Sequence, residues 1–258
     1  MSENHHLNYK RYGKKGRVIV ILHGLFGMLD NWNTLAKNLS EDFQVYILDQ
    51  RNHGKSFHSS EMSYDLMTSD LLVFLTEHDL DQINLVGHSM GGKVAMNFAL
   101  KHPEYVDRLL IVDIAPIIYA PAHYSIFSAI EHIDFSQGPT RADIASIMSE
   151  KITQPAIIQF LMKNLGRDEN KNLRWKMNWR AIQQNYEALN RWELDGQQFY
   201  GDVLFIKGDR SAYIKEEDYP TILKHFPKAK IITIRKAGHW VHAEQPVALL
   251  DAFRQFIC

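Results

Sequence analysis

The sequence predicts an α/β fold in which a mostly parallel central sheet is flanked by helices. As far as residue 114, short β-branched apolar runs alternate with helical patterns, and the alternation returns after residue 196. Between these two parts the patterns are helical alone. Apolar strands bounded by turns and separated by helices favour parallel pairing with both faces of the sheet covered. We therefore expect a core from residues 1–114 and 196–258, and a helical cap at residues 115–195, inserted after the strand that ends at Asp113.

The first part of the core is expected to contain four strands. They are the apolar runs at residues 17–22, 44–49, 83–86 and 108–113. Helical patterns lie between them, at residues 32–39, at residues 64–78 and directly after Ser89. Crossovers between parallel strands are right-handed almost without exception, so this order nearly fixes the topology.

The insertion and the second part of the core follow in the same way. In the insertion we expect helices at residues 124–133, 141–151, 154–165 and 179–191, and no strand. After it we expect strands at residues 202–207 and 230–234, with helices at residues 219–225 and 247–256. The insertion is rich in aromatic residues, which are expected to pack it against the core and to wall part of a substrate pocket.

Composition and charge narrow the class of protein. The 258 residues are 45% hydrophobic and carry a formal net charge of −1, whereas nucleic-acid-binding proteins are usually clearly basic. Residues 1–17 lack the apolar core of a signal peptide, and no apolar run is long enough to cross a membrane. The one cysteine, Cys258, rules out an internal disulfide and fits a reducing compartment. We expect a cytoplasmic protein with no nucleic-acid partner, no membrane association and no evident obligate protein partner.

The most informative segment runs from residue 83 to residue 102. An apolar run leads into Gly87-His88-Ser89-Met90-Gly91, and a helical pattern follows at once. A strand, a G-x-S-x-G pentapeptide and a helix in this order are typical of a nucleophile elbow. The sharp turn would strain Ser89 and lift its hydroxyl clear of the sheet, while the glycines let strand and helix pass closely. Ser89 is the predicted nucleophile.

The predicted base is His239. A serine hydroxyl is a weak nucleophile unless a base lies within hydrogen-bond reach. His239 lies just past the last predicted strand and before the closing helix, where a loop at the carboxyl edge of a parallel sheet would bring it to Ser89. His242 is the alternative, although we expect it to pack against the next helix.

Together these motifs resemble the α/β-hydrolase fold over nearly the whole chain. The resemblance rests on Ser89 in its elbow, on His239 in a G-H-x-x-x-x-E-x-P loop, and on His23-Gly24 after the first strong strand. HGLFG at residues 23–27, DQRNHGKS at 49–56 and VDIAP at 112–116 are similar to the YbfF-type cytoplasmic esterases of bacteria. That family hydrolyses carboxylic esters and acyl thioesters and uses no cofactor.

The resemblance also implies an oxyanion hole made of two backbone N–H groups. One belongs to Met90, the residue after the nucleophile. The other comes from the loop after His23-Gly24, where Leu25 is favoured and Phe26 is the neighbour that could replace it. Because backbone N–H groups bind the oxyanion, the side chains of these residues can be apolar.

The identity of the third triad residue is open between two aspartates. The chain order Ser, Asp, His leaves Asp113 after one strand or Asp209 after the next. Most α/β-hydrolases carry the acid as G-x-x-D after the later strand, but that segment reads Gly208-Asp209-Arg210-Ser211. The YbfF-type resemblance implies the acid at Asp113, which we favour.

Two further charged features have structural explanations. Asp49 and Arg51 are expected to form a partly buried ion pair that shapes the loop beneath the site, and His53 in the same loop is expected to be solvated. Lysines and arginines between residues 163 and 180 form a loose basic run. Such a run is usually a solvated face, and a more specific hypothesis is that it attracts the phosphates of an acyl-coenzyme A.

We therefore predict a serine hydrolase of carboxylic esters or acyl thioesters, with Ser89, His239 and Asp113 as triad and Leu25 and Met90 as oxyanion donors. No cofactor is implied, and no cluster of residues has metal-ligand spacing. A C–C bond hydrolase or a cofactor-free haloperoxidase would keep the same triad. A non-catalytic ligand-binding protein on this scaffold is the alternative from another class, and fold alone does not decide among them.

Overall fold

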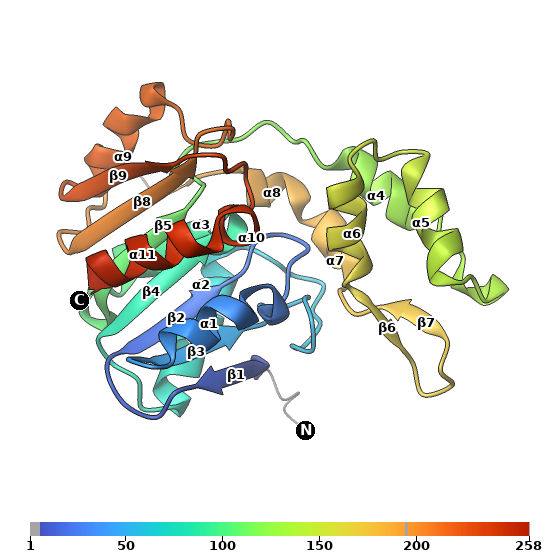
Figure 1. Ribbon diagram of the computed structural model, residues 1–258, viewed down its shortest axis with the longest axis horizontal. Coiled ribbons are helices and arrows are strands. Elements are labelled where there is room, and N and C mark those ends of the chain that lie inside the picture. The colour runs from blue at the N-terminus through green and yellow to red at the C-terminus, as the bar shows by residue number, and fades with distance from the viewer. Residues whose placement is uncertain (1–5, 194–195, 258) are drawn as a thin grey trace.

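The computed structural model describes residues 6–193 and 196–257, and its centre is a seven-stranded sheet (Figure 1). The strand order is β1-β3-β2-β4-β5-β8-β9. β1 pairs antiparallel with β3, and the other neighbours in this sheet are parallel. The predicted fold class, a mostly parallel sheet flanked by helices, is confirmed.

Most strands begin and end within two residues of the predicted positions. The strands of the sheet are β1 (Tyr9–Tyr12), β2 (Val18–Leu22), β3 (Gln44–Leu48), β4 (Ile83–His88), β5 (Val106–Val112), β8 (Asp202–Gly208) and β9 (Ala229–Ile234). β1 was not predicted. Its sequence, YKRY, lies on the edge of the sheet with largely exposed side chains, so it carries no hydrophobic periodicity to reveal it.

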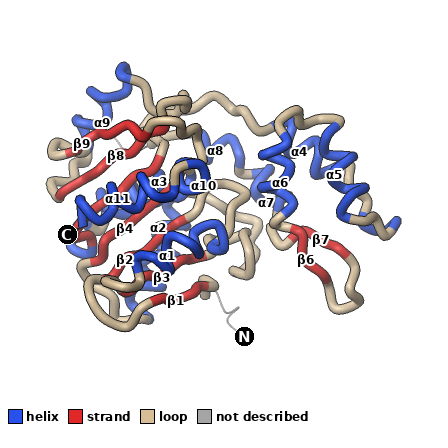
Figure 2. The backbone as a smooth tube through the Cα atoms, in the orientation of Figure 1, coloured by secondary structure: helices blue, strands red, loops and turns tan. Residues whose placement is uncertain are grey.

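Helices cover both faces of the sheet (Figure 2). The core helices are α1 (Asn33–Leu39), α2 (Tyr64–Glu77), α3 (Met90–Lys101), α9 (Tyr219–His225), α10 (Val241–Glu244) and α11 (Pro246–Ile257), with 3-10 turns η1 (Leu29–Trp32), η2 (Pro103–Tyr105) and η4 (Glu216–Asp218). Ile19 and Ile21 of β2 share a buried cluster with α1 and α11, whereas Val20 and Leu22 share another with α2 and α3. Alternate residues of a strand point to opposite faces, which explains why residues 19–22 are all buried.

The segment between β5 and β8 contains more than the predicted helices. Its elements are α4 (Tyr124–Glu131), η3 (Phe135–Gln137), α5 (Arg141–Ser149), α6 (Pro155–Met162), β6 (Leu165–Arg167), β7 (Leu173–Trp175), α7 (Trp179–Gln184) and α8 (Tyr186–Asn190). The expectation of no strand here was wrong, because β6 and β7 form an antiparallel hairpin too short for a pattern to show. The helix predicted at residues 179–191 is divided at Asn185, whose side chain donates to the carbonyls of Ser60 and Ala181.

The topology brings several chain segments to one edge of the sheet. Because β4, β5, β8 and β9 are parallel neighbours, the residues that follow these strands leave the sheet at the same edge. Ser89 follows β4, Asp113 follows β5, Ser211 comes shortly after β8 and His239 comes after β9. The inserted segment also leaves the sheet at this edge, and its helices lie beside it (Figure 1).

Candidate active site

Ser89 occupies a strained turn between β4 and α3. Its φ of 53° and ψ of −120° lie in a region that residues with a side chain rarely adopt. A Cβ on Gly87 would lie 2.2 Å from the carbonyl oxygen of Gly91, and a Cβ on Gly91 would lie 2.5 Å from that of His23. Both glycines are therefore required by close backbone approach, as the sequence motif predicts.

His239 bridges Ser89 and Asp113. Its Nε2 lies 3.0 Å from Ser89 Oγ, and its Nδ1 lies 2.7 Å from Asp113 Oδ2. An ionised carboxylate only accepts hydrogen bonds, so Nδ1 carries the proton and Nε2 is free to accept from the serine hydroxyl. The Tyr213 ring stacks on the imidazole with 3.8 Å between centroids and an interplanar angle of 18°. The three predicted triad residues thus form one hydrogen-bonded chain.

Asp113 is fully buried and held by other donors besides His239. Its Oδ1 accepts from the backbone N–H of Gly208 at 3.0 Å, and its Oδ2 also accepts from the hydroxyl of Ser211. Asp209, the alternative acid, instead accepts from the backbone N–H of Ala237 at 3.1 Å. The geometry brings Asp113, and not Asp209, to His239.

The two predicted oxyanion donors border the same space. Leu25, Ser89 and Met90 all line one cavity. Met90 opens α3, where backbone N–H groups lack a partner within the helix. The N–H of Phe26 donates to Nε2 of His53 at 3.2 Å, so Phe26 is already engaged. This favours Leu25 over Phe26 as the second donor.

The DQRNHGKS loop supports the oxyanion loop in a way that the sequence did not suggest. His53 was expected to be solvated, but the structure shows that it is buried. Burial lowers its pKa to about 3. A neutral ring is what allows Nε2 to accept from Phe26 while Nδ1 donates to the carbonyl of Arg51. His23 acts similarly, since burial lowers its pKa to about 4 and its Nε2 accepts from the N–H of Gln50 at 3.0 Å.

The predicted Asp49–Arg51 ion pair was wrong. Arg51 pairs with Asp70 of α2, with Nε 2.6 Å from Oδ2 and Nη2 2.7 Å from Oδ1. Asp49 accepts from the backbone N–H groups of Leu29 and Lys55, at 2.8 and 2.9 Å. The side chains of Asp49 and Arg51 therefore have separate partners, although the two residues are only two positions apart in the sequence.

His88 fixes the loop that carries His239. Its Nε2 lies 2.8 Å from the carbonyl oxygen of His239, and burial holds its pKa well below the usual range. The neutral ring therefore donates to that carbonyl and anchors the backbone of His239. His242, the alternative base, stacks on Trp32 with 4.5 Å between centroids, and burial lowers its pKa to about 3. His242 is therefore neutral and packed against Trp32, and it also borders the space beside His239.

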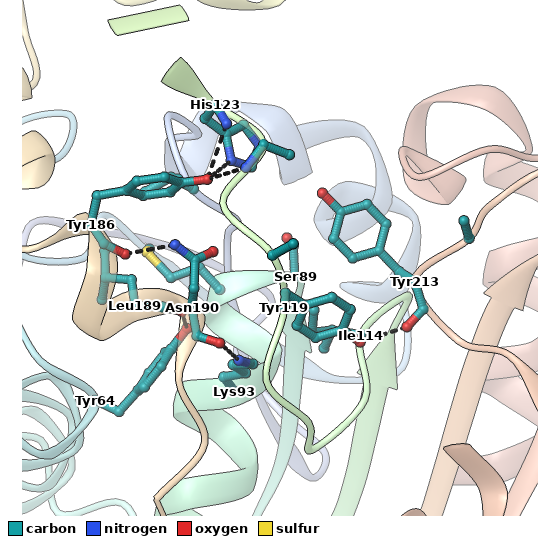
Figure 3. Close-up of a pocket in the computed structure, with 15 residues that line it drawn as sticks. Tyr64, Ser89, Lys93, Ile114, Tyr119, His123, Tyr186, Leu189, Asn190 and Tyr213 are labelled. Atoms are coloured by element: carbon teal, nitrogen blue, oxygen red, sulfur yellow. Dashed lines mark hydrogen bonds between the residues drawn. The ribbon is translucent and has the colours of Figure 1, made fainter. Parts of the chain in front are cut away.

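Two cavities meet at Ser89. The Lys93 cavity has a volume of about 310 Å³ and is lined by Lys93, Tyr64, Tyr119, Ile114 and Tyr186 among others (Figure 3). The His239 cavity has a volume of about 620 Å³ and is lined by His239, Phe26, Phe160, Trp240 and Ile126 among others. Leu25, Ser89, His123 and Tyr213 border both. The inserted segment therefore contributes to both walls, as its aromatic content suggested.

His123 is a neutral hydrogen-bond donor on the border of both cavities. The Tyr186 hydroxyl accepts from the backbone N–H groups of Ala122 and His123, at 2.9 and 3.1 Å. With both lone pairs engaged, its proton faces Nδ1 of His123, which lies 2.6 Å away. Burial lowers the His123 pKa to about 4, so the ring is neutral and its proton sits on Nε2.

Besides the roles of His53 and His123, sequence reasoning missed other residues that shape this site. They include Ser211 beside Asp113, Tyr213 and His88 beside His239, and Lys93 in one cavity. Lys93 alone had a signal, since it lies four residues after Ser89 on the same helix face. Within residues 6–193 and 196–257, no group of three metal-ligating side chains is close enough to hold a metal ion. In the same part of the chain, no helix has the length and apolar character needed to cross a membrane.

The chain is similar to known esterases. The model of the alpha/beta hydrolase fold matches residues 17–137. Esterase YbfF of Escherichia coli is 37% identical over 240 residues, which cover 93% of this chain and 92% of that protein. The sn-1-specific diacylglycerol lipase ABHD11 of Danio rerio is 36% identical over 262 residues, with 97% of this chain and 82% of that protein covered.

A solved structure is similar over almost the same length. A marine microorganism esterase is 40% identical and superposes with a TM-score of 0.94. The match covers 97% of this chain and 99% of the other.

Proposed function

This chain belongs to the α/β hydrolase family, among the relatives of esterase YbfF, and we propose that it is a serine esterase whose nucleophile is Ser89. His239 is its general base and acid, Asp113 orients that base, and the N–H groups of Leu25 and Met90 bind the oxyanion. The observation that carries this proposal is the hydrogen-bonded chain from Asp113 through His239 to Ser89, at 2.7 and 3.0 Å. Removing any member of such a chain lowers kcat by orders of magnitude.

In the first half of the reaction, Ser89 becomes acylated. His239 Nε2 accepts the hydroxyl proton as Ser89 Oγ attacks the ester carbonyl carbon. The carbonyl oxygen becomes an oxyanion, which the N–H groups of Leu25 and Met90 stabilise. His239 then gives its Nε2 proton to the departing alkoxide or thiolate, and the acyl group stays on Ser89. Throughout, Asp113 holds Nδ1 and stabilises the imidazolium.

The second half of the reaction returns the enzyme to its starting state. His239 Nε2 takes a proton from water, whose oxygen attacks the acyl-enzyme carbonyl. The same two N–H groups bind the second oxyanion. Its collapse breaks the bond to Ser89 Oγ, which regains the proton, and the carboxylic acid leaves.

The two cavities receive different halves of the ester. The leaving group must lie beside His239, which protonates it, and His239 lines only the larger cavity. We therefore assign the alcohol or thiol half to the His239 cavity and the acyl half to the Lys93 cavity. A volume of about 310 Å³ lies at the small end of ligand sites and favours short or medium acyl chains. In this proposal the described part of the insertion, residues 115–193, is the cap that contributes walls to both cavities.

A thioester such as an acyl-coenzyme A is the finer form of this proposal. Arg174, on β7, and Lys163, before β6, are exposed members of the predicted basic run. Reversing the charge at Arg174 and Lys176 should raise KM for an acyl-CoA and leave neutral esters unaffected. An equal change in KM for both substrates would show that Arg174 and Lys176 do not bind the phosphates. The single cysteine of the sequence supports a cytoplasmic location, which belongs to the same proposal.

The test uses p-nitrophenyl esters with acyl chains from acetyl to palmitoyl, beside the matching acyl-CoAs, on wild-type protein and Ser89→Ala. We expect hydrolysis of the shorter esters by the wild type and loss of turnover in the variant. Comparable turnover in both would refute the serine mechanism. Folded wild-type protein that hydrolyses none of them would favour C–C bond cleavage or ligand binding instead.

A further inference from the structure

Lys93 is a buried lysine one helical turn after the nucleophile. It is 1% exposed, and its ammonium donates to the backbone carbonyls of Asn190 and Arg191, at 3.2 and 2.9 Å. Its Nζ lies 4.9 Å from the ring centroid of Tyr119 and 5.6 Å from that of Tyr64. No carboxylate among the described residues pairs with it. Buried charges in proteins are normally paired with an opposite charge, whereas the hydrogen-bond partners of this ammonium among the described residues are neutral carbonyls.

The ammonium has one donor left for a ligand. Lysine carries three N–H groups, and two are engaged by the carbonyls of Asn190 and Arg191. The phenols around it are already committed as donors, since Tyr64 donates to the carbonyl of Leu189 and Tyr119 donates to that of Tyr213. The third N–H of Lys93 has no hydrogen-bond acceptor among the described residues, and it lies in a cavity whose other walls are mostly aromatic and aliphatic.

Lys93 and Ser89 face the same cavity. The N–H of Lys93 donates to the carbonyl of Ser89 at 3.1 Å, which closes the first turn of α3. Side chains four apart lie on one helix face, and a helical side chain leans toward the N-terminus, here toward Ser89. Figure 3 shows both residues lining the Lys93 cavity.

The absence of a partner carries an electrostatic cost. Burial alone lowers the pKa of Lys93 to about 7, because no nearby negative charge offsets the loss of hydration. A ligand carboxylate would supply the missing charge and favour the protonated amine. A purely aliphatic ligand would instead exclude water from the ammonium without supplying a negative charge.

We propose that Lys93 binds a carboxylate at the far end of the acyl group, so that the preferred substrates are esters or thioesters of short dicarboxylic acids with the other carboxyl free. This inference rests on the proposed function, because it requires the acyl half to occupy the Lys93 cavity. Lys93 is then a specificity-determining residue that touches the substrate but not the reacting carbonyl.

The separation of the two residues sets the length of the acid. Four residues of helix span about 6 Å. With carbon–carbon bonds of about 1.5 Å, a spacer of about three or four methylene groups covers a comparable distance. Adipic acid falls in this range and serves as the probe.

The test compares three p-nitrophenyl esters on wild-type protein: the half-ester of adipic acid, its neutral carboxamide analogue and the hexanoate. The carboxamide matches the carboxylate in shape and keeps an acceptor oxygen, so it separates charge from hydrogen bonding. We expect kcat/KM for the half-ester to exceed that for the carboxamide by about tenfold, mainly through KM, since hydrogen bonds between charged groups are the stronger ones. Equal values, or preference for the carboxamide, would overturn the inference.

Two variants complete the test. Lys93→Met keeps the length of the side chain and removes the charge, and it should abolish the preference for the half-ester. Lys101→Met is the matched control, because Lys101 lies on the same helix and pairs with Asp65 outside the cavity. If Lys93 serves only to hold the carbonyls of Asn190 and Arg191, Lys93→Met will change all three substrates equally, which refutes the inference.

The outcomes keep the two proposals apart. If hydrolysis of the hexanoate depends on Ser89 but the half-ester is not preferred, the proposed role of Lys93 is wrong and the proposed esterase activity is supported. Absence of Ser89-dependent hydrolysis of all three esters would remove the esterase itself. If Lys93→Met does not fold, the wild-type comparison of half-ester with carboxamide still decides.

Discussion

The hydroxyl of Ser211 donates a hydrogen bond to Oδ2 of Asp113, the same oxygen that faces Nδ1 of His239. Ser211 stands at the position where most α/β-hydrolases carry the triad acid. In the proposed mechanism the acid is Asp113, which follows the neighbouring strand β5, and Ser211 hydrogen-bonds to it from the usual acid position. The pairing of β5 with β8 makes this exchange possible, because residues 112 and 206 are register partners and both strands end at the same edge.

We predict that Ser211→Ala lowers kcat about tenfold with little change in KM. The carboxylate keeps its bonds to His239 and Gly208 but loses one donor that fixes its orientation, and a hydrogen bond to a charged group is worth about 1.5–3 kcal/mol. Steady-state kinetics on p-nitrophenyl hexanoate provide the measurement. An unchanged kcat would mean that the Ser211 contact has no part in orienting the acid.

A much larger loss is expected at Asp113. Asp113→Asn should lower kcat by about 10⁴-fold, because an amide can hold the imidazole in the wrong tautomer. Asp209→Asn is the matched control and should leave kcat within about threefold, as surface changes rarely propagate. If Asp209→Asn lowers kcat by orders of magnitude and Asp113→Asn does not, the assignment of Asp113 as the acid is wrong.

The sequence was sufficient for the residues whose role depends on local order along the chain. The elbow around Ser89 and the loop of His239 are each recognisable from a strand, a turn and a helix in succession. Ser211, Tyr213 and His88 could not be found in this way, because each contacts a residue of another loop, from 26 to 151 positions away along the chain. The same reason explains why Arg51 was paired with its neighbour Asp49 and not with a residue on α2.

Secondary structure was missed where hydrophobic periodicity is absent. β1 is an exposed edge strand, and β6 and β7 contain three residues each. Strands this short do not alternate long enough to be distinguished from loops. The buried parallel strands, which position the site, are long apolar runs and were found within two residues of their ends.

The preference for the half-ester should depend on pH. Below about 7 Lys93 is protonated and can bind a carboxylate, and above it the ammonium is lost. The phenols of Tyr64 and Tyr119 stay neutral in this range, because burial raises the pKa of both. We expect the ratio of kcat/KM for half-ester over carboxamide to fall from pH 6 to about pH 9, since kcat/KM reports groups of the free enzyme.

Taking a ratio cancels every effect of pH that acts on both substrates alike. In Lys93→Met the ratio should be flat across the same range. A wild-type ratio that is constant with pH would contradict the binding of the carboxylate by Lys93.

Stability should depend on the ion pair between Arg51 and Asp70. Their side chains are only 8% and 11% exposed, so Arg51→Met would leave a nearly buried carboxylate without its partner. We expect the free energy of unfolding to fall by about 3 kcal/mol, measured by urea denaturation. Lys215→Met breaks an exposed pair with Glu217 and should change it by less than about 0.5 kcal/mol. Similar effects from both would show that the Arg51 pair adds little.

The most direct test of the central claim is covalent labelling of Ser89. An organophosphonate that mimics the tetrahedral intermediate is incubated with wild-type protein, Ser89→Ala and His239→Ala, and the labelled peptide is identified by mass spectrometry. We predict one label per chain on Ser89, loss of esterase activity in step with labelling, no label in Ser89→Ala and slow labelling in His239→Ala. A label on another residue, or esterase activity that survives full modification of Ser89, would contradict the account.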